Sequence, residues 1–461
     1  MAEENAIKNT ILSNEFVVDW EGFDDPAEPL NWPSGRKAIN IILLSCLTFV
    51  TPLASSMFAP GIPRVMRDFQ SDSAILASFV VSVYLIGYAA GPLICAPLSE
   101  LYGRVPIYHI TNVLFIIFTI ACAVAPSLDS LVGFRFLAGT AGSAPLVLGG
   151  GSVADLYRRE ERGPVAGAFL AQNVGWRWIF WVITIAAGVV TMACLLFMKE
   201  TYSPVLLERK AARLRKSRGN TQYQSKLSTG DSPGTAFAKA LIRPTKMFFR
   251  SSIVFLFVIY VSIIYGYLYL LFTTITEVYE GTYGFSTGLA GLSYIGIGVG
   301  MFIGLGLFGA TSDRRIRRKQ EKHGDTTPEV RLEGLVPAAI CIPIGLFWYG
   351  WSAEKQIHWI MPIIGTAWVG LGLIGIFMAV QTYLVDCYPI YAASVTAANT
   401  VVRSLVGAFL PLAGRPLYSD LGLGWGNSLL AFIALAMVPL PLIFMRYGAW
   451  LRTHPRFQVS L

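Results

Sequence analysis

Two arginines, Arg135 and Arg403, are the only formally charged residues inside the long apolar runs of this sequence. A charged side chain in such a run is costly, so an arginine there is a functional residue by default. Gln381 and Asn399 are polar residues in similar surroundings, and we expect them, with Arg403, to face the interior of a helix bundle. For Arg135 an alternative stays open, because it lies within a turn or two of one end of its run and could extend its guanidinium to the interface.

Two pairs of tyrosines add aromatic groups to these polar ones. Tyr84 and Tyr88 are four residues apart, as are Tyr265 and Tyr269, so each pair shares one face of a helix. We interpret both pairs as walls of a candidate cavity. The alternative is that their rings are ordinary core or lipid-facing aromatics.

Carboxylates and arginines recur on turns that follow apolar runs at equivalent places in the two halves of the chain. A carboxylate and an arginine on a tight turn can form a charge latch between helices, whereas the alternative is an ordinary solvated turn. Two further aspartates occupy matching places, in Ala154-Asp-Leu-Tyr157 and Val385-Asp-Cys-Tyr388. The predicted gating residues are Glu100 with Arg104, Asp313 with Arg314, and the pair Asp155 and Asp386.

The amino-acid composition indicates the class of protein to which these groups belong. Of 461 residues, 54% are hydrophobic and 14% are charged, whereas soluble domains carry roughly 25% charged residues. A helix needs about 20 apolar residues to cross a membrane, and eleven runs reach that length. They lie near residues 38–58, 75–95, 107–126, 130–152, 178–197, 252–273, 288–310, 334–351, 359–383, 391–413 and 427–445. The sequence therefore predicts an all-α, polytopic membrane protein.

The distribution of Lys and Arg predicts how the chain crosses the membrane. Twelve crossings with both termini in the cytosol keep nearly all basic residues on the cytosolic side, whereas eleven crossings place many of them outside. A twelfth apolar stretch, 164–173, has only ten residues and would be about 15 Å long as a helix, half of a span. The fifth crossing is therefore predicted to be shortened.

The crossings define five parts of the chain. Their expected bounds are an acidic, flexible cytosolic tail at 1–37, a transmembrane half at 38–198, a basic cytosolic linker at 199–250, a second half at 251–446 and a cytosolic tail at 447–461. The net charge of +8 is concentrated in the linker, so it signals topology rather than nucleic-acid binding. Within the linker, Glu208–Lys216 could form a basic amphipathic helix on anionic lipid.

Several stretches resemble the major facilitator superfamily, whose members have two six-helix halves about a central site. The turn Ala96-Pro-Leu-Ser-Glu-Leu-Tyr-Gly-Arg104 is similar to its signature loop, with Glu100 where Asp is usual. Arg135 and Gly139 are similar to its R-x-x-x-G element, and Leu53–Pro63 resembles an element of the drug:proton antiporter branch. Further stretches resemble fungal multidrug and polyamine exporters, namely Ser78–Tyr88, Tyr265–Thr274 and Ala397–Ser404. The resemblance extends from Asn31 to Arg452.

This resemblance implies a secondary transporter that works by alternating access. The expected activity is proton-coupled efflux of amphipathic or cationic small organic compounds such as drugs, polyamines or secondary metabolites, with Arg135 binding substrate or assisting proton exchange. The expected partners are that substrate, protons and the lipid bilayer, with no nucleic acid and a monomeric state. The plasma membrane is the expected location, with the vacuolar membrane as the alternative.

Antiporters of this branch carry a Gly/Pro-rich fifth helix, and here only Gly163-Pro164-Val-Ala-Gly167-Ala168 remains. Three explanations stay open: a deletion in the gene, an error in splicing or in the deduced gene structure, or a re-entrant element. The chain could thus be an inactive transporter remnant, or a membrane protein that binds or senses without transporting. A membrane-embedded enzyme is disfavoured because the cysteines and histidines are scattered, so we expect no catalytic cluster, metal site or cofactor.

Overall fold

The computed structural model describes residues 16–22, 24–156, 176–227, 233–323, 328–388 and 392–453. Within these ranges the chain is almost entirely helical, and ten helical stretches are long and apolar enough to cross a membrane. All eleven predicted runs overlap these stretches, and the last stretch, Ser394–Gly448, contains most of two of them. The all-α, multi-span prediction is therefore confirmed. The shortened fifth segment, 164–173, lies outside the described residues.

The first half of the bundle consists of long helices interrupted at prolines and small residues. Its elements are η1 (Pro29–Asn31), α2 (Ser34–Ser56), η2 (Ala59–Gly61), α3 (Ile62–Asp68), α4 (Ala74–Tyr102), α5 (Arg104–Ala123), α6 (Leu128–Gly142), α7 (Ala144–Leu156) and α8 (Trp176–Phe197). Pro60 and Pro63 fall in the first turns of η2 and α3, where a proline replaces an N–H that has no helical partner. A serine capping box at Ser127 and Ser130 starts α6.

The second half has the same helical character and a larger continuous core. Its elements are α11 (Ser252–Tyr283), α12 (Thr287–Leu292), α13 (Ile295–His323), η4 (Pro328–Gly334), α14 (Leu335–Glu354), α15 (Ile360–Cys387), α16 (Ala392–Phe409), η6 (Leu410–Ala413), α17 (Gly414–Met437) and α18 (Pro439–Thr453). Its core gathers buried residues of α11, α13, α14, α15 and α17. α11 contributes most to that core, because side chains all around it are buried.

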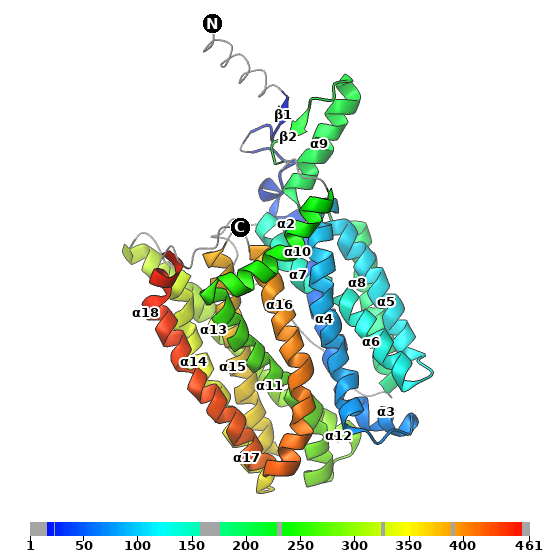
Figure 1. Ribbon diagram of the computed structural model, residues 1–461, viewed down its shortest axis with the longest axis vertical. Helices are drawn as coiled ribbons and strands as arrows, with labels where there is room; N and C mark the ends of the chain where they lie inside the picture. Colours follow the sequence, from blue (N-terminus) through cyan, green and yellow to red (C-terminus); the bar gives the residue numbers. More distant parts are fainter. Residues whose placement is uncertain are drawn as a thin grey trace.

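The two halves meet along α4 and α16, which pack against each other, and α16 also packs against α7 and α11 (Figure 1). α16 therefore contacts both halves and can carry side chains to a site between them. Its residues at this junction are small or polar, such as Ala397, Asn399 and Ser404, all of which are buried. Small residues allow helices to approach closely in a membrane.

The segment between the halves contains α9 (Ser203–Arg218), β2 (Gln224–Ser225) and α10 (Pro233–Arg250). α9 projects from one end of the bundle and α10 crosses that end obliquely (Figure 1). We call this end the linker end. β2 pairs in parallel with β1 (Val17–Val18), so the start of the described chain binds the linker.

Opposite charges hold this strand pair together, and we call the arrangement the tail–linker clasp. Lys226 donates to Asp19, and Lys210 lies 3.0 Å from a carboxylate oxygen of Glu21. Because the Lys226 ammonium donates to it, the pKa of the Asp19 carboxyl lies below its usual value. The prediction of a flexible tail is therefore wrong for the described part of 1–37. α9 does form as a helix, but the clasp and its projection from the bundle disagree with a position flat on lipid.

Candidate functional site

Arg135 is the centre of a buried cluster in the first half. α6 carries it, and only 1% of its surface is exposed. Its Nε donates to the carbonyl oxygen of Val80 at 2.6 Å, and one terminal nitrogen lies 3.4 Å from the carbonyl oxygens of Ser55 and Val81. Arg135 therefore joins α6 to both α2 and α4, and it does not extend to the interface.

Aromatic rings surround the same guanidinium. Its carbon lies 4.4 Å from the ring centre of Phe58 and 5.5 Å from that of Tyr84. Gly139, one turn after Arg135, makes this approach possible, because a Cβ atom there would lie 2.1 Å from the carbonyl oxygen of Tyr84. Among the described residues no carboxylate pairs with Arg135, so carbonyl dipoles and ring faces compensate its charge.

Tyr84 and Tyr88 also bind α2. The Tyr84 hydroxyl donates to the Thr51 carbonyl oxygen, and the Tyr88 hydroxyl to the Thr51 side chain, both at 2.7 Å. The two rings lie 5.3 Å apart, and both residues are buried. The predicted shared face is therefore observed, and it faces the bundle interior rather than lipid.

Arg403 is a buried arginine of the second half, although its helix follows Asp386 whereas Arg135 precedes Asp155. It lies on α16, is 3% exposed, and its guanidinium carbon lies 4.5 Å from the ring centre of Tyr265 and 5.0 Å from that of Phe377. Its Nε is buried with no hydrogen-bond partner among the described residues. Gly407 follows one turn later, so an R-x-x-x-G spacing occurs in both halves. Aromatic faces, rather than hydrogen bonds, hold this second arginine.

Gln381 and Asn399 continue this polar surface between α15 and α16. The Asn399 amide donates to the Gln381 side-chain oxygen, and Gln381 donates to the Thr396 hydroxyl, each at 3.0 Å. The side-chain oxygen of Asn399 is buried without a partner in the described part of the chain. An unsatisfied buried acceptor one turn from Arg403 is a group that a polar ligand can satisfy.

Ser55 and Tyr269 connect the two arginine clusters. The Tyr269 hydroxyl donates to the Ser55 side chain at 3.0 Å, and the Tyr265 hydroxyl lies 3.4 Å from that of Tyr269. The carbonyl of Ser55 contacts Arg135, and the Tyr265 ring lies beside Arg403. All eight predicted pathway residues thus belong to one polar and aromatic cluster between the halves, or lie within a turn of it.

Sequence reasoning missed several members of this cluster. Thr51 and Ser55 lie four residues apart on α2, and Phe58 and Phe377 cover the two arginines. Two polar residues at helical spacing in an apolar run could have identified Thr51 and Ser55. Phe58 lies within Leu53–Pro63, the element noted above, whereas nothing in the local sequence distinguishes Phe377 from other aromatic residues.

Each half places an arginine–aspartate ion pair at the linker end. Arg104 lies 3.2 Å from Asp155, and Arg331 lies 2.9 Å from Asp386. Burial raises the pKa of the Asp155 carboxyl, and the guanidinium of Arg104 opposes that rise. The two aspartates predicted at matching places are therefore both paired with arginine. We call these two pairs the linker-end pairs.

Glu100 and Arg104 do not form the local ion pair that the sequence predicts. Glu100 faces Arg243 of α10 at 3.8 Å, so the structure pairs Arg104 with Asp155 rather than with Glu100. α5 begins directly at Arg104, and its side chain donates both to Asp155 of α7 and to Ser99 of α4. Arg314 is exposed on α13, and the side chain of Asp313 lies outside the described part. The second predicted latch, Asp313 with Arg314, therefore stays a prediction.

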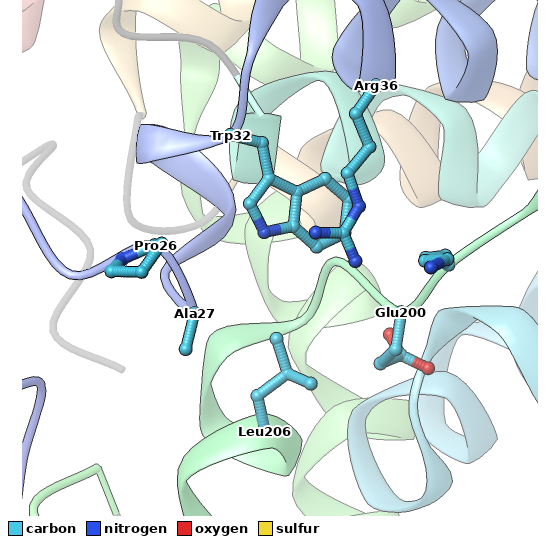
Figure 2. Close-up of a pocket in the computed structure, with 7 residues that line it drawn as sticks. Pro26, Ala27, Trp32, Arg36, Glu200 and Leu206 are labelled. Carbon is cyan, nitrogen blue, oxygen red and sulfur yellow. The ribbon is translucent and has the colours of Figure 1, made fainter.

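Glu200 is a further linker-end residue that the sequence did not reveal. Its carboxylate accepts hydrogen bonds from the backbone N–H groups of Arg104 and Val105, at 2.9 and 3.1 Å. A carboxylate there satisfies free N–H groups and the positive end of the α5 dipole. Glu200 also borders a crevice of about 390 Å³ (Figure 2). Residues of the tail, α2 and the linker line this crevice, and no predicted pathway residue does.

The halves touch at both ends of the bundle. At the linker end, Ala397 of α16 packs in a cluster with Leu44 and Tyr108 of the first half. At the opposite end, Phe272 and Tyr294 pack against the cluster that contains Phe58. The polar cluster around the arginines therefore lies between two closed contacts.

Comparison with known proteins agrees with this architecture. The sequence profile of the Major Facilitator Superfamily matches residues 44–164 and 163–411. The MFS-type transporter penM of Penicillium rubens is 56% identical over 470 residues, which covers 98% of this chain and 92% of penM. The efflux pump radE of Floropilus chiversii is 48% identical, with 96% and 86% covered.

A solved structure shows the same fold at low sequence identity. The proton:xylose symporter XylE superposes with a TM-score of 0.63 and 17% identity, covering 90% of this chain and 96% of XylE. The alignment with penM spans 470 positions, more than the 461 residues of this chain, so penM contains residues that this chain lacks. The two profile matches meet at residues 163 and 164.

Proposed function

The chain belongs to the major facilitator superfamily of multi-pass membrane transporters, and from this premise we propose that it exports small organic compounds by alternating access. The observation that carries the proposal is the cluster that runs from Arg135 through Ser55, Tyr269 and Tyr265 to Arg403. It draws on both halves and lies between contacts at both ends. Opening either end while the other stays closed would expose this cluster to one side at a time.

The chemistry of the cluster supports an amphipathic substrate with aromatic or polar groups. Tyr265, Phe377 and Tyr88 offer ring faces, and Asn399 offers a buried acceptor without a partner. Because the site already contains two arginines, neutral or anionic polar groups on the substrate would be favoured close to them, and any cationic group would bind at a ring face that neither guanidinium covers. Outward transport is supported by the 48% identity to a protein named as an efflux pump.

The proposal also covers proton coupling and the orientation of the chain in the membrane. The sequence resemblance to drug:proton antiporters supports proton exchange, and the excess of Lys and Arg in the linker supports a cytosolic linker end. The linker-end pairs, Arg104–Asp155 and Arg331–Asp386, would then open when the site faces the cytosol. We propose a monomer in the plasma membrane, with the vacuolar membrane as the alternative.

The test is retention of a fluorescent amphipathic dye in yeast cells that lack their own exporters. Cells that express the chain should retain several-fold less rhodamine 6G than empty-vector cells, and a protonophore should abolish the difference. Arg403→Gln should restore retention, whereas Arg209→Gln, an exposed residue of α9, should not. Equal dye retention in expressing and empty cells would contradict export of this dye class.

A second candidate is a chain that reaches the membrane without transporting. The meeting of the profile matches at residues 163 and 164, and the extra length of penM, favour it. A chimera that receives the corresponding penM segment separates the two readings. If only the chimera exports dye, the present chain is a non-transporting form. If both export equally, the missing segment is dispensable.

A further inference from the structure

α10 has three chemically different groups of side chains. Pro244, Met247 and Phe248 pack against the bundle. Ile242 and Phe249, seven residues apart, share a second face and are 49% and 73% exposed. Lys246 and Arg250, four residues apart, form a basic stripe along one edge of that apolar face, and both are exposed. An exposed apolar face beside a basic stripe is typical of a helix that lies in a membrane interface.

The position of α10 agrees with that interpretation. α10 ends at Arg250, and α11, which is long and apolar enough to cross a membrane, begins at Ser252. Phe249 is therefore three residues before a helix that is apolar enough to span a membrane, so we expect it near the membrane surface. Figure 1 shows α10 crossing the linker end obliquely, whereas α9 projects away from the bundle.

The positive charge of α10 favours an anionic partner. Residues 233–250 contain Lys239, Arg243, Lys246 and Arg250 and no acidic residue. Arg243 points to Glu100 of α4, so it is committed to the bundle. The outward basic stripe has no carboxylate of its own helix to pair with, and lipid phosphates and carboxylates are the anions present at that depth.

We propose that α10 is an anionic-lipid-binding helix, with Phe249 and Ile242 inserted among acyl chains and Lys246 and Arg250 bound to an anionic headgroup. The helix also packs against α4 and α16, the two helices along which the halves meet. Bound lipid therefore holds a helix that bridges both halves at the linker end. The proposal does not depend on transport, because lipid binding is measured on the resting protein.

The test uses the purified full chain in detergent micelles that contain equal amounts of phosphatidylserine and phosphatidylcholine. Native mass spectrometry counts the lipids that stay bound. The wild-type chain should retain phosphatidylserine preferentially, and Lys246→Gln with Arg250→Gln should reduce that retention about tenfold. The matched control is Arg209→Gln with Lys216→Gln on α9, which removes the same charge from exposed positions and should change nothing.

Further measurements distinguish lipid binding by α10 from general charge attraction, phosphate binding and dimer formation. Phe249→Ser should lower retention of both lipids several-fold while the gel-filtration profile stays monodisperse. Equal loss of phosphatidylserine in the α10 and α9 double variants would overturn the proposal, because general charge would then explain binding. Complete displacement of phosphatidylserine by millimolar inorganic phosphate would also overturn it, as would a dimer that Phe249→Ser converts to a monomer.

Discussion

The two halves contain the same short element, an arginine followed four residues later by a glycine, and they use it differently. Arg135 is fixed by three backbone carbonyls on α2 and α4. Arg403 has ring faces as its neighbours and no hydrogen bond among the described residues, while each arginine has one buried nitrogen without a partner there. Gly139 packs against backbone, whereas Gly407 packs against side chains of Leu85 and Tyr265.

This difference indicates a division of labour within one site. Backbone carbonyls of packed helices cannot move without moving the helices, so the Arg135 side is rigid. Aromatic side chains can rotate, and Arg403 has little else to hold it, so the Arg403 side can adapt to a bound molecule. The first half thus provides a fixed reference surface and the second half an adjustable one.

The glycines should give the largest contrast. In Gly139→Ala the new Cβ would lie 2.1 Å from a backbone oxygen, so α4 and α6 must separate, and we expect a loss of about 3 kcal/mol or more in stability. In Gly407→Ala the nearest atoms are side-chain carbons at 3.0 Å, and we expect a loss below about 1 kcal/mol. Thermal unfolding of the purified variants measures both, and equal losses would contradict the rigid–adjustable contrast.

Replacing each arginine by lysine should slow dye export to different extents. Lysine retains the charge but lacks the planar fork that contacts carbonyls on two helices, so Arg135→Lys should slow dye export about 100-fold. An ammonium group also binds aromatic faces, so Arg403→Lys should slow it less than about tenfold. Initial export rates at matched expression check this. Similar losses in both variants would show that Arg403 also needs its fork.

The contact between the halves should be sensitive to one hydroxyl. Tyr269→Phe removes the bond to Ser55, worth about 1 kcal/mol, and should favour opening about fivefold. Tyr267→Phe is the matched control, because the Tyr267 hydroxyl is buried without a partner in the described chain. The readout is maleimide labelling of Ser404→Cys in a chain without its native cysteines. Unchanged labelling in Tyr269→Phe would show that this bond does not hold the halves together.

The smallest effects concern the rings over each arginine. Phe377→Leu removes one of the two rings beside Arg403 and should weaken transport two- to fivefold, since a cation–π contact contributes about 0.5–1 kcal/mol. Phe58→Leu should change it less than about twofold, because carbonyls still hold Arg135. The concentration dependence of export measures both. A larger effect at Phe58 would reverse the proposed contrast.

The sequence predicts the helices and the buried polar and aromatic residues that gather between the halves, because both depend on local patterns. Apolar length identifies the spans, and four-residue spacing identifies the tyrosine pairs. Partners across distant helices follow from tertiary packing instead. The spacing of Glu100 and Arg104 favours a local pair, yet α5 directs Arg104 to Asp155, and Glu200 caps α5 from 96 residues away. Two basic helices follow each other in the linker, and only the structure shows that α10 packs against α4 and α16 whereas α9 projects from the bundle.

The tail–linker clasp has a consequence for the order in which the chain is made. Asp19 and its partner Lys226 are 207 residues apart. At roughly 5–20 residues per second, about 10–40 seconds separate the synthesis of the two residues. The first half therefore leaves the ribosome while β1 is still unpaired, because β2 has not yet been synthesised. The clasp can therefore form only after the whole first half has been synthesised, and it can do so before most of the second half has been translated.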